Sequence, residues 1–550
     1  MNKVVVKQVG VKSLAKAEVA AKPVTAKPVT AKPATAKPVT AKLATAKPAS
    51  ATAAKQAAAR PAVRKGEARQ SDVRQAETRK PEPKPVSTAE PAKRRPGPIT
   101  TYIRAQAFLQ SLSDVEKLRI VRYDEKTFDL TRMRTLLRKL GNPQDKFKSV
   151  HVAGTKGKGS TCCMVASMLQ ANGFKVGLYT SPHLVDLRER IQINQQGGSA
   201  VISEADFTRL VAKIAPHITR ARPTPSYFDV LTAIAFMYYA EQQVDIAVIE
   251  TGLGGRLDST NVLNPEVTAL TSISFDHMAQ LGRTLTRIAR EKAGIFKPGV
   301  PAVTVIQDPE AARVIETTAE EVEAPLDVVG KTVEFSYRFE ANRMLGRHNR
   351  LCLFTPNSRF EHLAVPMHGE HQAINAGLAL TVMDKLKSRG FAIDDAKSTE
   401  GLLACKMPGR MELLQTNPRV LLDCAHNAAS LDALMKAIGQ HMVYDALVLI
   451  FGCCADKDVD AMLAKITGGA DKVIFLPVES VRTADPHDMA QRYAETHGRM
   501  AQVAENLDEA LAIAARAATR DDLIAITGSF YLVGEAKKHF DGKRRQPVAG

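Results

Sequence analysis

A glycine-rich segment, Gly154–Thr161 (GTKGKGST), constrains the fold of this chain more than any other feature. A short apolar stretch, Phe147–Ala153, precedes it, and an apolar helical pattern, CCMVASMLQANGF, follows it. A strand, a glycine-rich turn and a helix in this order are typical of a phosphate-binding loop in an α/β sheet. The glycines let backbone N–H groups point inward, the helix N-terminus adds positive potential, and Lys158 supplies a mobile cation between the β- and γ-phosphates. The segment therefore predicts a nucleotide-binding α/β domain.

The first 98 residues differ in composition from the rest of the 550-residue chain. They hold 22 basic and six acidic side chains, so they carry +16 of the net charge of +18 and leave the remainder nearly neutral. From Ala21 a five-residue unit repeats six times, from AKPVT to AKPAS, and all 28 Phe and Tyr residues lie at or beyond Tyr102. Regular prolines prevent a continuous helix, and a segment without aromatic residues has little with which to build a core. We therefore expect residues 1–98 to form a disordered, extended, basic tail.

Three interpretations of this tail stay open. It is an electrostatic arm for nucleic acid or an anionic surface, whose affinity would fall steeply with salt, or a solubilising extension without a dedicated partner. The third interpretation is a transit peptide, although such segments are usually richer in Arg and Ser. The tail lacks aromatic residues on which bases would stack, which favours the solubilising extension.

Several classes of protein are excluded by composition. No stretch approaches the roughly 18 consecutive apolar residues that a membrane helix needs, and Lys residues interrupt the N-terminus where a signal peptide needs an apolar run. The cysteines include two adjacent pairs and no CxxC, so they predict neither a disulfide framework nor a zinc site. We expect reduced, mostly buried thiols in a cytoplasmic protein. The seven cysteines are at positions 162, 163, 352, 405, 424, 453 and 454.

The globular part is too long for one core, because single cores stop growing at roughly 250–300 residues. Apolar spacing predicts helices over 103–120 and 127–140, before the strand that leads into the glycine-rich segment. Near residue 405 the pattern changes to alternating short strands and helices, from VLLDCA to DLIAITGS, which predicts a small parallel α/β sheet. We therefore expect an ATP-binding domain over 99–405 and a smaller, Rossmann-like domain over 406–550.

Nine ordered blocks between about residue 100 and about residue 540 resemble the folylpolyglutamate synthase/dihydrofolate synthase branch of the Mur ligase superfamily. The resemblance implies a central ATPase domain with a phosphate-binding loop, followed by a Rossmann-like C-terminal domain. The blocks are GTKGKGST (154–161), LYTSPHLVDLRERIQIN (178–194), IETGLGGRLDSTN (249–261), SFDHMAQLG (274–282), REKAGIFKPG (290–299), GEHQAINAGLAL (369–380), MPGRMELL (407–414), LLDCAHNAASL (421–431) and GSFYLVGE (528–535).

A carboxylate at the end of a buried strand is the first candidate metal ligand. Glu250 follows the apolar run 245–249, and the carboxyl edge of an open α/β sheet is where ligands collect. A carboxylate there suits Mg²⁺, a hard cation, facing the nucleotide phosphates. The resemblance assigns the magnesium to Glu250, Ser181 and His277, and implies a carbamylated Lys292 that supports it. By spacing alone, His277 would be a surface or core residue and Lys292 a solvated residue of a helix. We expect Lys292→Ala to reduce turnover more than the loss of a surface lysine.

The resemblance also assigns residues to ATP and to the pterin substrate. Lys158 and His426 act at the reacting phosphate, and His426 belongs to the second domain. Asp423 follows a strand signal, and its alternative role is the N-cap of the next helix. Lys156 departs from the family, which usually has Asn there, so the contacts of the loop are less certain than its affinity for ATP. The predicted nucleotide-binding residues are Gly154, Thr155, Lys156, Gly157, Lys158, Gly159, Ser160, Thr161, Arg410 and Asp423, and the predicted substrate-binding residues are Ser181, Pro182 and His183.

The implied reaction is ATP-dependent amide formation. A carboxylate is a poor electrophile, so ATP first converts it into an acyl phosphate, which the amino group of L-glutamate then attacks. The carboxylate would belong to dihydropteroate, to a reduced folate, or to both, and a site shared by two domains would need to close to exclude water. Two alternatives remain: a Mur-type ligase for another carboxylate, and a nucleic-acid-binding ATPase that acts through the basic tail. We expect a monomer.

Overall fold

The computed structural model describes residues 98–114 and 128–545, with side chains to residue 542. The predicted tail therefore lies outside the described residues, except for Pro98. Helix α1 spans Tyr102–Gln110 and α2 spans Leu130–Lys139. The helix predicted over 103–120 is wrong at Ser111–Asp114, which is non-helical because Ser and Asp side chains compete with the helix for backbone hydrogen bonds; residues 115–120 lie outside the described residues.

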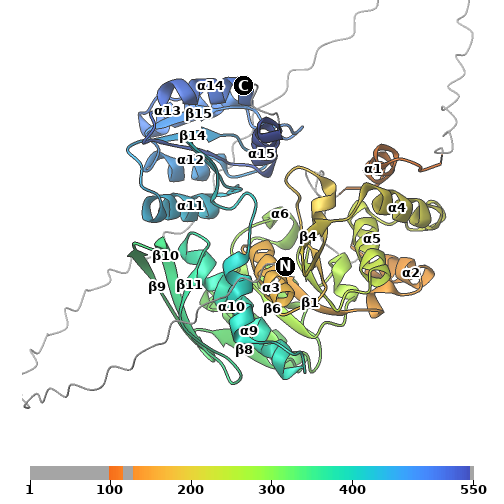
Figure 1. The fold of residues 1–550 in the computed structure, drawn as a ribbon. Helices are drawn as coiled ribbons and strands as arrows, with labels where there is room; N and C mark the ends of the chain where they lie inside the picture. The colour runs from red at the N-terminus through yellow and green to blue at the C-terminus, as the bar shows by residue number, and fades with distance from the viewer. Residues whose placement is uncertain (1–97, 115–127, 546–550) are drawn as a thin grey trace, which may run out of the picture. The chain divides into compact units, whose positions relative to one another are not determined.

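An eight-stranded sheet forms the centre of the first part of the chain (Figure 1), in the order β4-β3-β2-β5-β1-β6-β7-β8. The six strands from β2 to β8 in this order are parallel, while β3 and β4 continue the edge in antiparallel pairing. The chain order reverses around β1, so the carboxyl ends of β1, β5 and β6 form the crevice where such sheets bind ligands. The strands are β1 (Lys148–Ala153), β2 (Val176–Tyr179), β3 (Ile191–Gln195), β4 (Gly198–Val201), β5 (Ile246–Glu250), β6 (Val267–Leu270), β7 (Ala302–Val305) and β8 (Leu326–Val329).

Helices cover both faces of this sheet. Helices α3, α9 and α10 share one apolar cluster with the strands, and α1, α2, α4 and α5 share another on the opposite face. The elements are α3 (Lys158–Ala171), α4 (Glu204–Thr219), α5 (Tyr227–Glu241), α6 (Met278–Leu281), α7 (Leu285–Ala293), α8 (Pro309–Glu321), α9 (Glu370–Ser388), α10 (Asp395–Ala404) and the 3₁₀ turns Pro143–Asp145, Leu187–Arg190 and Ser259–Val262.

Three antiparallel strands, which the sequence pattern did not predict, follow the large sheet. They are β9 (Glu334–Asn342), β10 (Gly346–Phe354) and β11 (Arg359–Val365), with β10 in the middle. Buried residues of β10 and β11, such as Leu351 and Val365, join the same apolar cluster as α9. This sheet therefore extends the platform on which α9 lies.

A six-stranded sheet holds the last part of the chain, in the order β12-β13-β17-β14-β15-β16. The predicted parallel sheet is observed for β13 to β17, but β12 pairs antiparallel with β13 as a hairpin, a pairing that the alternation of strands and helices does not reveal. Buried residues of α11, α12 and α13 share one apolar cluster with the strands, and those of α14 and α15 share another. The elements are β12 (Glu412–Thr416), β13 (Arg419–Leu422), α11 (Ala428–His441), β14 (Leu447–Phe451), α12 (Val459–Thr467), β15 (Lys472–Phe475), α13 (Pro486–His497), β16 (Gln502–Val503), α14 (Leu507–Ala517), β17 (Leu523–Thr527) and α15 (Phe530–Arg545).

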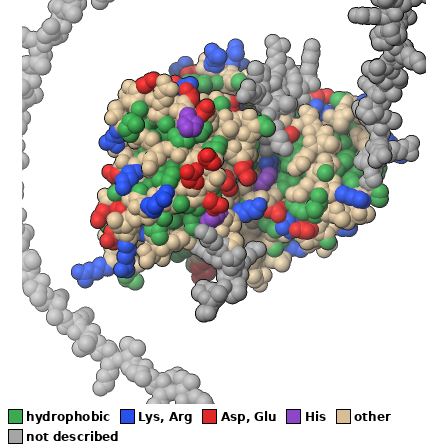
Figure 2. Space-filling model, turned by 90° about the horizontal axis from the view of Figure 1, so that it is seen from above, with side chains coloured by type: hydrophobic (Ala, Val, Ile, Leu, Met, Phe, Trp, Pro, Cys, Tyr) green, Lys and Arg blue, Asp and Glu red, His purple; other side chains and the backbone are tan. Residues whose placement is uncertain are grey.

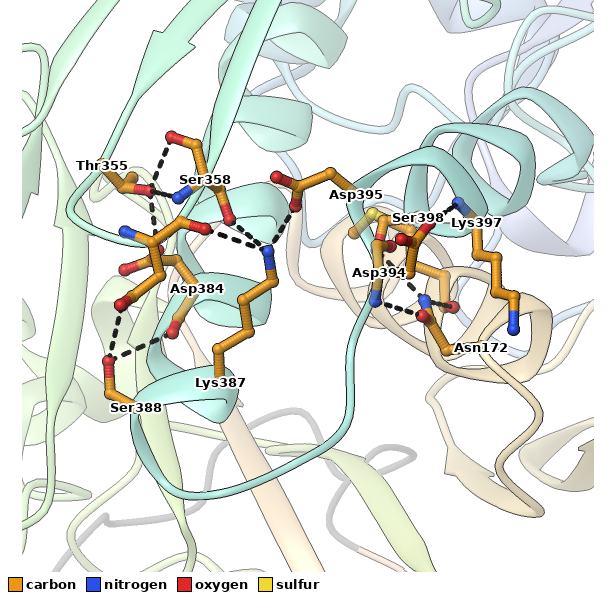
Figure 3. A network of polar contacts seen from close by, with 12 residues as sticks. Asn172, Thr355, Ser358, Asp384, Lys387, Ser388, Asp394, Asp395, Lys397 and Ser398 are labelled. Atoms are coloured by element: carbon orange, nitrogen blue, oxygen red, sulfur yellow. Dashed lines mark hydrogen bonds and ion pairs between the residues drawn. The ribbon is translucent and has the colours of Figure 1, made fainter.

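Polar contacts fasten the end of α9 to the elements around it (Figure 3). Lys387 donates to Asp395 at the start of α10 over 2.6 Å and to Ser358 in the β10–β11 turn over 2.9 Å. The buried Asp384 accepts from Thr355 over 2.7 Å, and Asn172, beyond α3, donates to Ser398 of α10 over 3.0 Å. The first part of the chain is thus fixed up to α10, immediately before the connection to the six-stranded sheet.

The surface of the described residues carries charges of both signs. On the face seen in Figure 2, Asp and Glu side chains gather near the middle, while most Lys and Arg side chains lie toward the margins. This mixture agrees with the nearly neutral composition of the chain beyond residue 98. In the part of the chain that the structure describes, none of the helices is both long and apolar enough to span a bilayer.

Candidate active site

A cleft of about 1590 Å³ is lined by residues that follow strands of both the eight-stranded and the six-stranded sheet. It brings together most residues that the sequence predicts for the site. Three predicted residues, Gly154, Thr161 and Lys292, do not line it. The predicted residues that do are Thr155, Lys156, Gly157, Lys158, Gly159, Ser160, Ser181, Pro182, His183, Glu250, His277, Arg410, Asp423 and His426.

The glycine-rich loop begins directly after β1 and ends in the first turn of α3, as predicted. Gly157 is the N-cap of α3 with a φ of 88°, and Gly154 has a φ of 145°, conformations that favour glycine. A Cβ at Gly154 would overlap Thr271, and a Cβ at Gly157 would overlap the side chain of Asn375 on α9. The loop therefore owes its shape to its own glycines and to the elements that close on it. The N–H groups of Thr155 and Lys156 donate to the carbonyl of Ser272, so the N–H groups at the start of α3 are the ones left for an anion.

Glu250 ends β5 and lies beside the loop. Its Oε1 is 3.9 Å from Nζ of Lys158, and its Oε2 accepts from the backbone N–H of Ser181 over 3.0 Å. The side chain is buried, and burial raises the pKa of the carboxyl while Lys158 opposes that rise. A cation thus faces a carboxylate at the carboxyl edge of the sheet, where the sequence predicts a metal ligand.

Lys292 is buried in α7, so its alternative description as a solvated helix lysine is wrong. Its Nζ donates to the carbonyl of Gly154 over 2.7 Å, directly behind the loop. Burial, and then the charge of Lys158, lower the pKa of Lys292 to about 7. A large fraction of this amine is therefore neutral, and hence nucleophilic, near neutral pH.

His277 lies at the mouth of the cleft in a left-handed conformation, with a φ of 49°. Its ring reaches solvent, yet the protein around it removes enough water to lower the pKa to about 4. The neighbouring Asp276 has a lowered pKa: burial raises it, but His277, Lys457 and His426 together outweigh burial. His277 is therefore neutral at neutral pH, the form in which an imidazole binds a metal.

On the other side of the cleft, Asp423 follows β13. Its two carboxylate oxygens accept the backbone N–H groups of Met411 and Ala425, each over 2.9 Å. It does not cap the following helix: Asn427 is the N-cap of α11 and accepts from the N–H of Ser430 over 3.0 Å. The N-cap alternative for Asp423 is therefore wrong, and its carboxylate fixes the turn before β12, which carries Arg410.

Arg410 and His426 both pack on Phe530 at the start of α15. The guanidinium carbon of Arg410 lies 5.1 Å from the centre of the Phe530 ring, and the His426 ring lies 5.2 Å from it. Nδ1 of His426 donates to the carbonyl of Cys424 over 2.8 Å, which leaves Nε2 as an acceptor in the neutral ring. Burial and Lys457 lower the pKa of His426 to about 4, so the ring is neutral at neutral pH.

The proposed substrate segment Ser181–His183 lies between the loop and a buried arginine. Nε of Arg190 donates to Nδ1 of His183 over 2.9 Å, which holds the His183 ring in one orientation. Apolar side chains such as Phe228 and Val185 line the same end of the cleft. A flat, mostly apolar ring system with a few polar groups suits this end.

Four cleft residues were not singled out from the sequence: Gln372, Asn375, Lys457 and Phe530. Nε2 of Gln372 reaches Oγ of Ser160 over 3.5 Å, and Asn375 donates to Gln372 over 3.1 Å. Three of them lie within the blocks GEHQAINAGLAL and GSFYLVGE, so the resemblance marked the segments but not the residues. Gln372 and Asn375 are three positions apart in α9, a spacing that places them on one helix face.

No group of three or more His, Cys, Asp or Glu side chains within residues 98–114 and 128–542 is arranged to hold a metal by itself. Mg²⁺ commonly binds through one or two carboxylates together with substrate phosphates, and Glu250 next to the loop fits that mode. All seven cysteines are free thiols, and four of them are buried, as predicted.

A phosphate-binding loop on one sheet that faces charged residues of a second sheet defines an ATP-dependent ligase of the Mur type. The model of the Mur ligase middle domain matches residues 152–383, and that of the Mur ligase glutamate ligase domain matches residues 409–530.

Similarity to known proteins identifies the family within this class. The chain is 35% identical over 415 residues to a dihydrofolate synthase/folylpolyglutamate synthase of Bacillus subtilis, covering 74% of this chain and 94% of that protein. The structure resembles that of Mycobacterium tuberculosis folylpolyglutamate synthase complexed with ADP, with a TM-score of 0.71, 32% identity, and coverage of 81% and 99% of the two chains. It also resembles Escherichia coli FolC in complex with DHPP and ADP, with a TM-score of 0.69, 27% identity, and coverage of 81% and 99%. The chain belongs to the folylpolyglutamate synthase/dihydrofolate synthase family, whose members add glutamate to folates in an ATP-dependent reaction.

Proposed function

We propose that this chain joins L-glutamate to dihydropteroate, to the glutamate tail of reduced folates, or to both, through an acyl phosphate formed from ATP. The observation that carries the proposal is the two-sided cleft. A phosphate-binding loop and Glu250 lie on one side, and Arg410, Asp423 and His426 on the other. The ADP complex of the Mycobacterium tuberculosis relative and the DHPP and ADP complex of Escherichia coli FolC support it.

The loop side binds the phosphates and stabilises the transfer. N–H groups at the start of α3 hold the nucleotide phosphates, and Lys158 neutralises the γ-phosphoryl group as it moves to the substrate carboxylate. Glu250, with Ser181 and His277 nearby, would hold Mg²⁺, which supplies positive charge next to the phosphates. This binding needs no cage of protein ligands, in agreement with a single buried carboxylate beside Lys158.

Lys292 supports the metal site in this proposal as a carbamate. Carbamylation needs a neutral amine, and the pKa of Lys292, lowered to about 7 by burial, provides one. The product would carry an anionic oxygen behind the loop in place of a cation. ¹³C NMR of the folded protein in ¹³C-bicarbonate buffer would show a carbamate carbonyl signal that Lys292→Ala lacks. An unmodified Lys292 in active enzyme, or near-wild-type turnover of Lys292→Ala, would remove it from the site.

The six-stranded side orients ATP and receives the amino acid. Arg410 and Asp423 contact the nucleotide across the cleft, and His426, with Nε2 unprotonated, lies near the reacting phosphate. Lys457 is a half-buried cation of the cleft for which no ion pair is found within the described residues. L-Glutamate brings two carboxylates, and we assign one of them to Lys457. Lys457→Met is then expected to raise KM for glutamate more than KM for ATP.

One assay tests the function. Purified protein is mixed with ATP and L-glutamate, and ADP release is measured with dihydropteroate or tetrahydrofolate as the acceptor. Glutamate-dependent ADP release with either acceptor supports the proposal, and the preferred acceptor separates the two synthase activities. ATP hydrolysis that needs neither substrate would refute it.

The same assay on a chain without residues 1–98 separates the ligase from a nucleic-acid-binding ATPase. The ligase activity should persist after the deletion, whereas an activity that depends on the basic tail should be lost. We place the enzyme in the cytoplasm as a monomer, and its seven free thiols are the supporting observation for that compartment.

A further inference from the structure

The C-terminal end of α11 is bound to the first part of the chain. Nη1 of Arg347 on β10 donates to the carbonyls of Gln440 and Met442, over 3.2 and 3.0 Å. Gln440 belongs to the last turn of α11 and Met442 is its C-cap residue, so neither carbonyl has a partner within the helix. A cation at this end also complements the helix dipole.

His441, the last residue of α11, is held from two directions. Its Nε2 accepts the backbone N–H of Gly369 over 3.1 Å, and its Nδ1 donates to the carbonyl of Arg347 over 3.2 Å. The rings of Phe339 and His368 pack on it, with centroids 5.2 and 4.9 Å away. One acceptor and one donor on the same ring require the neutral form with the proton on Nδ1.

Gly369 is the N-cap residue of α9, the helix that closes on the phosphate loop. The side chain of Asn349 donates to the carbonyl of Gly369 over 2.9 Å, so both polar atoms of this residue are held. Within the first two turns of α9, Gln372 contacts Ser160 and Asn375 closes on Gly157. The other end of α9 is fastened by the contacts of Figure 3. The start of α9 is therefore held by β9 and β10, through Tyr337 and Asn349, and by α11, through His441.

The opposite end of α11 faces the cleft. Its N-cap, Asn427, follows His426, and the first turn of the helix lines the cleft. One 14-residue helix thus connects the cleft residues His426 and Asn427 to the residue that holds the start of α9.

We propose that Arg347, Gly369 and His441 form a pivot that sets His426, the residue before the N-cap of α11, in register with the phosphate loop, and that Arg347 and His441 are therefore positioning residues for phosphoryl transfer. The inference rests on the proposed function, because it presumes a nucleotide shared by both sides of the cleft. Loss of the pivot leaves the loop able to bind ATP but misplaces the groups that face it. Turnover should therefore fall while KM for ATP changes little.

The main test compares Arg347→Met with Arg343→Met, an exposed arginine in the same β9–β10 hairpin. Arg347→Met should lower kcat roughly five- to tenfold, with less than about twofold change in KM for ATP. Arg343→Met should match the wild type. Equal kcat for both variants, with or without a lower Tm for Arg347→Met, would show that Arg347 only stabilises the fold, and would overturn the proposal.

A second pair of variants tests the two hydrogen bonds of the His441 ring. Gln at position 441 can both accept from Gly369 and donate to Arg347, whereas Leu can do neither. His441→Gln should retain kcat within about twofold, and His441→Leu should lose roughly tenfold at a temperature well below its Tm. Equal turnover of the two variants would count against the pivot.

Amide hydrogen exchange tests the pivot without relying on the ligase assay. With ATP bound, the peptides covering Gly369 and Gly154–Thr161 should exchange faster in His441→Leu than in His441→Gln. If the wild type lacks glutamate-dependent ADP release, the proposed function fails, but the exchange still decides whether the pivot reaches the loop. Unchanged exchange at Gly154–Thr161 in His441→Leu would refute the coupling.

Discussion

The two sides of the cleft are built in different ways. The loop side comes from one contiguous segment, β1, Gly154–Thr161 and α3, with Glu250 added from the neighbouring strand. The six-stranded side assembles Arg410, Asp423 and Phe530 from segments that are up to 120 residues apart. Backbone N–H groups dominate the first side and side chains the second. The loop side should therefore fail when its own residues change, and the other side when a supporting contact is lost.

The largest effect is expected at Lys158, the loop residue whose side-chain charge lies near Glu250. Lys158→Met should lower kcat by about 10³-fold, because the charge that moves with the γ-phosphoryl group loses its counter-ion. The measurement is steady-state ADP release. Lys146→Met, an exposed lysine before β1, is the control and should behave as the wild type. A loss of kcat below about tenfold for Lys158→Met would mean that the backbone donors of the loop stabilise the transferred phosphoryl group without help from the Lys158 charge.

A smaller effect is expected on the opposite side. Asp423→Asn places an amide N–H₂ group against the N–H of Met411 or Ala425, so one of these donors loses its acceptor. An unsatisfied buried donor costs about 1–3 kcal/mol, and we expect kcat/KM for ATP to fall roughly 10- to 100-fold. Asp445→Asn, at an exposed position before β14, serves as the control. Wild-type kinetics for Asp423→Asn would show that the six-stranded side does not depend on this supporting contact.

Substitutions at Gly157 and Gly141 separate two effects on activity: the loss of the close contact between the loop and α9, and strain in the backbone. Gly157→Ala should lower kcat about tenfold, because the new Cβ overlaps Asn375 and displaces the loop. Gly141→Ala has a similar φ of 79° with open space around it, and should cost only about 1 kcal/mol of stability without loss of turnover. Adding Asn375→Ala should restore part of the activity of Gly157→Ala. No restoration would assign the whole loss to strain in the loop.

The last prediction concerns the stability of β1 beneath the loop and leaves turnover at neutral pH unchanged. His151 on β1 is fully buried, its Nε2 contacts Thr260 over 2.8 Å, and burial lowers its pKa to about 3. Because the unfolded chain binds the proton more readily, stability from the neutral ring is complete above pH 6.5 and is lost as pH falls toward 3. Between these values the free energy of unfolding should fall by about 1.4 kcal/mol per pH unit more in the wild type than in His151→Gln. Denaturant unfolding at several pH values measures the difference, and parallel pH profiles would contradict the assignment.

The sequence predicted where the candidate residues lie in the fold more accurately than it predicted their burial and their contacts. Lys158 and Glu250 lie at the ends of the strands that the apolar runs predict, because a buried strand and the turn after it are local features. The burial of Lys292 against Gly154 was not predictable, since it depends on how α7 packs behind the loop. The interaction of Asp423 with Met411 likewise arises from the pairing of β12 with β13, which the alternation of elements does not reveal.

The uneven charge and the segment Gly154–Thr161 were determined by the sequence itself. Composition alone assigns most of the basic charge to residues 1–98, and a strand, glycines and a helix in succession suffice for a phosphate loop because its donors are backbone groups. Only the tertiary structure decided how α9 closes on Gly157 and how His441 joins α11 to the start of α9. Those contacts connect residues that are 72 to more than 200 positions apart, and no local pattern records them. They depend on apolar faces and hydrogen-bonding groups that meet only after both sheets have formed.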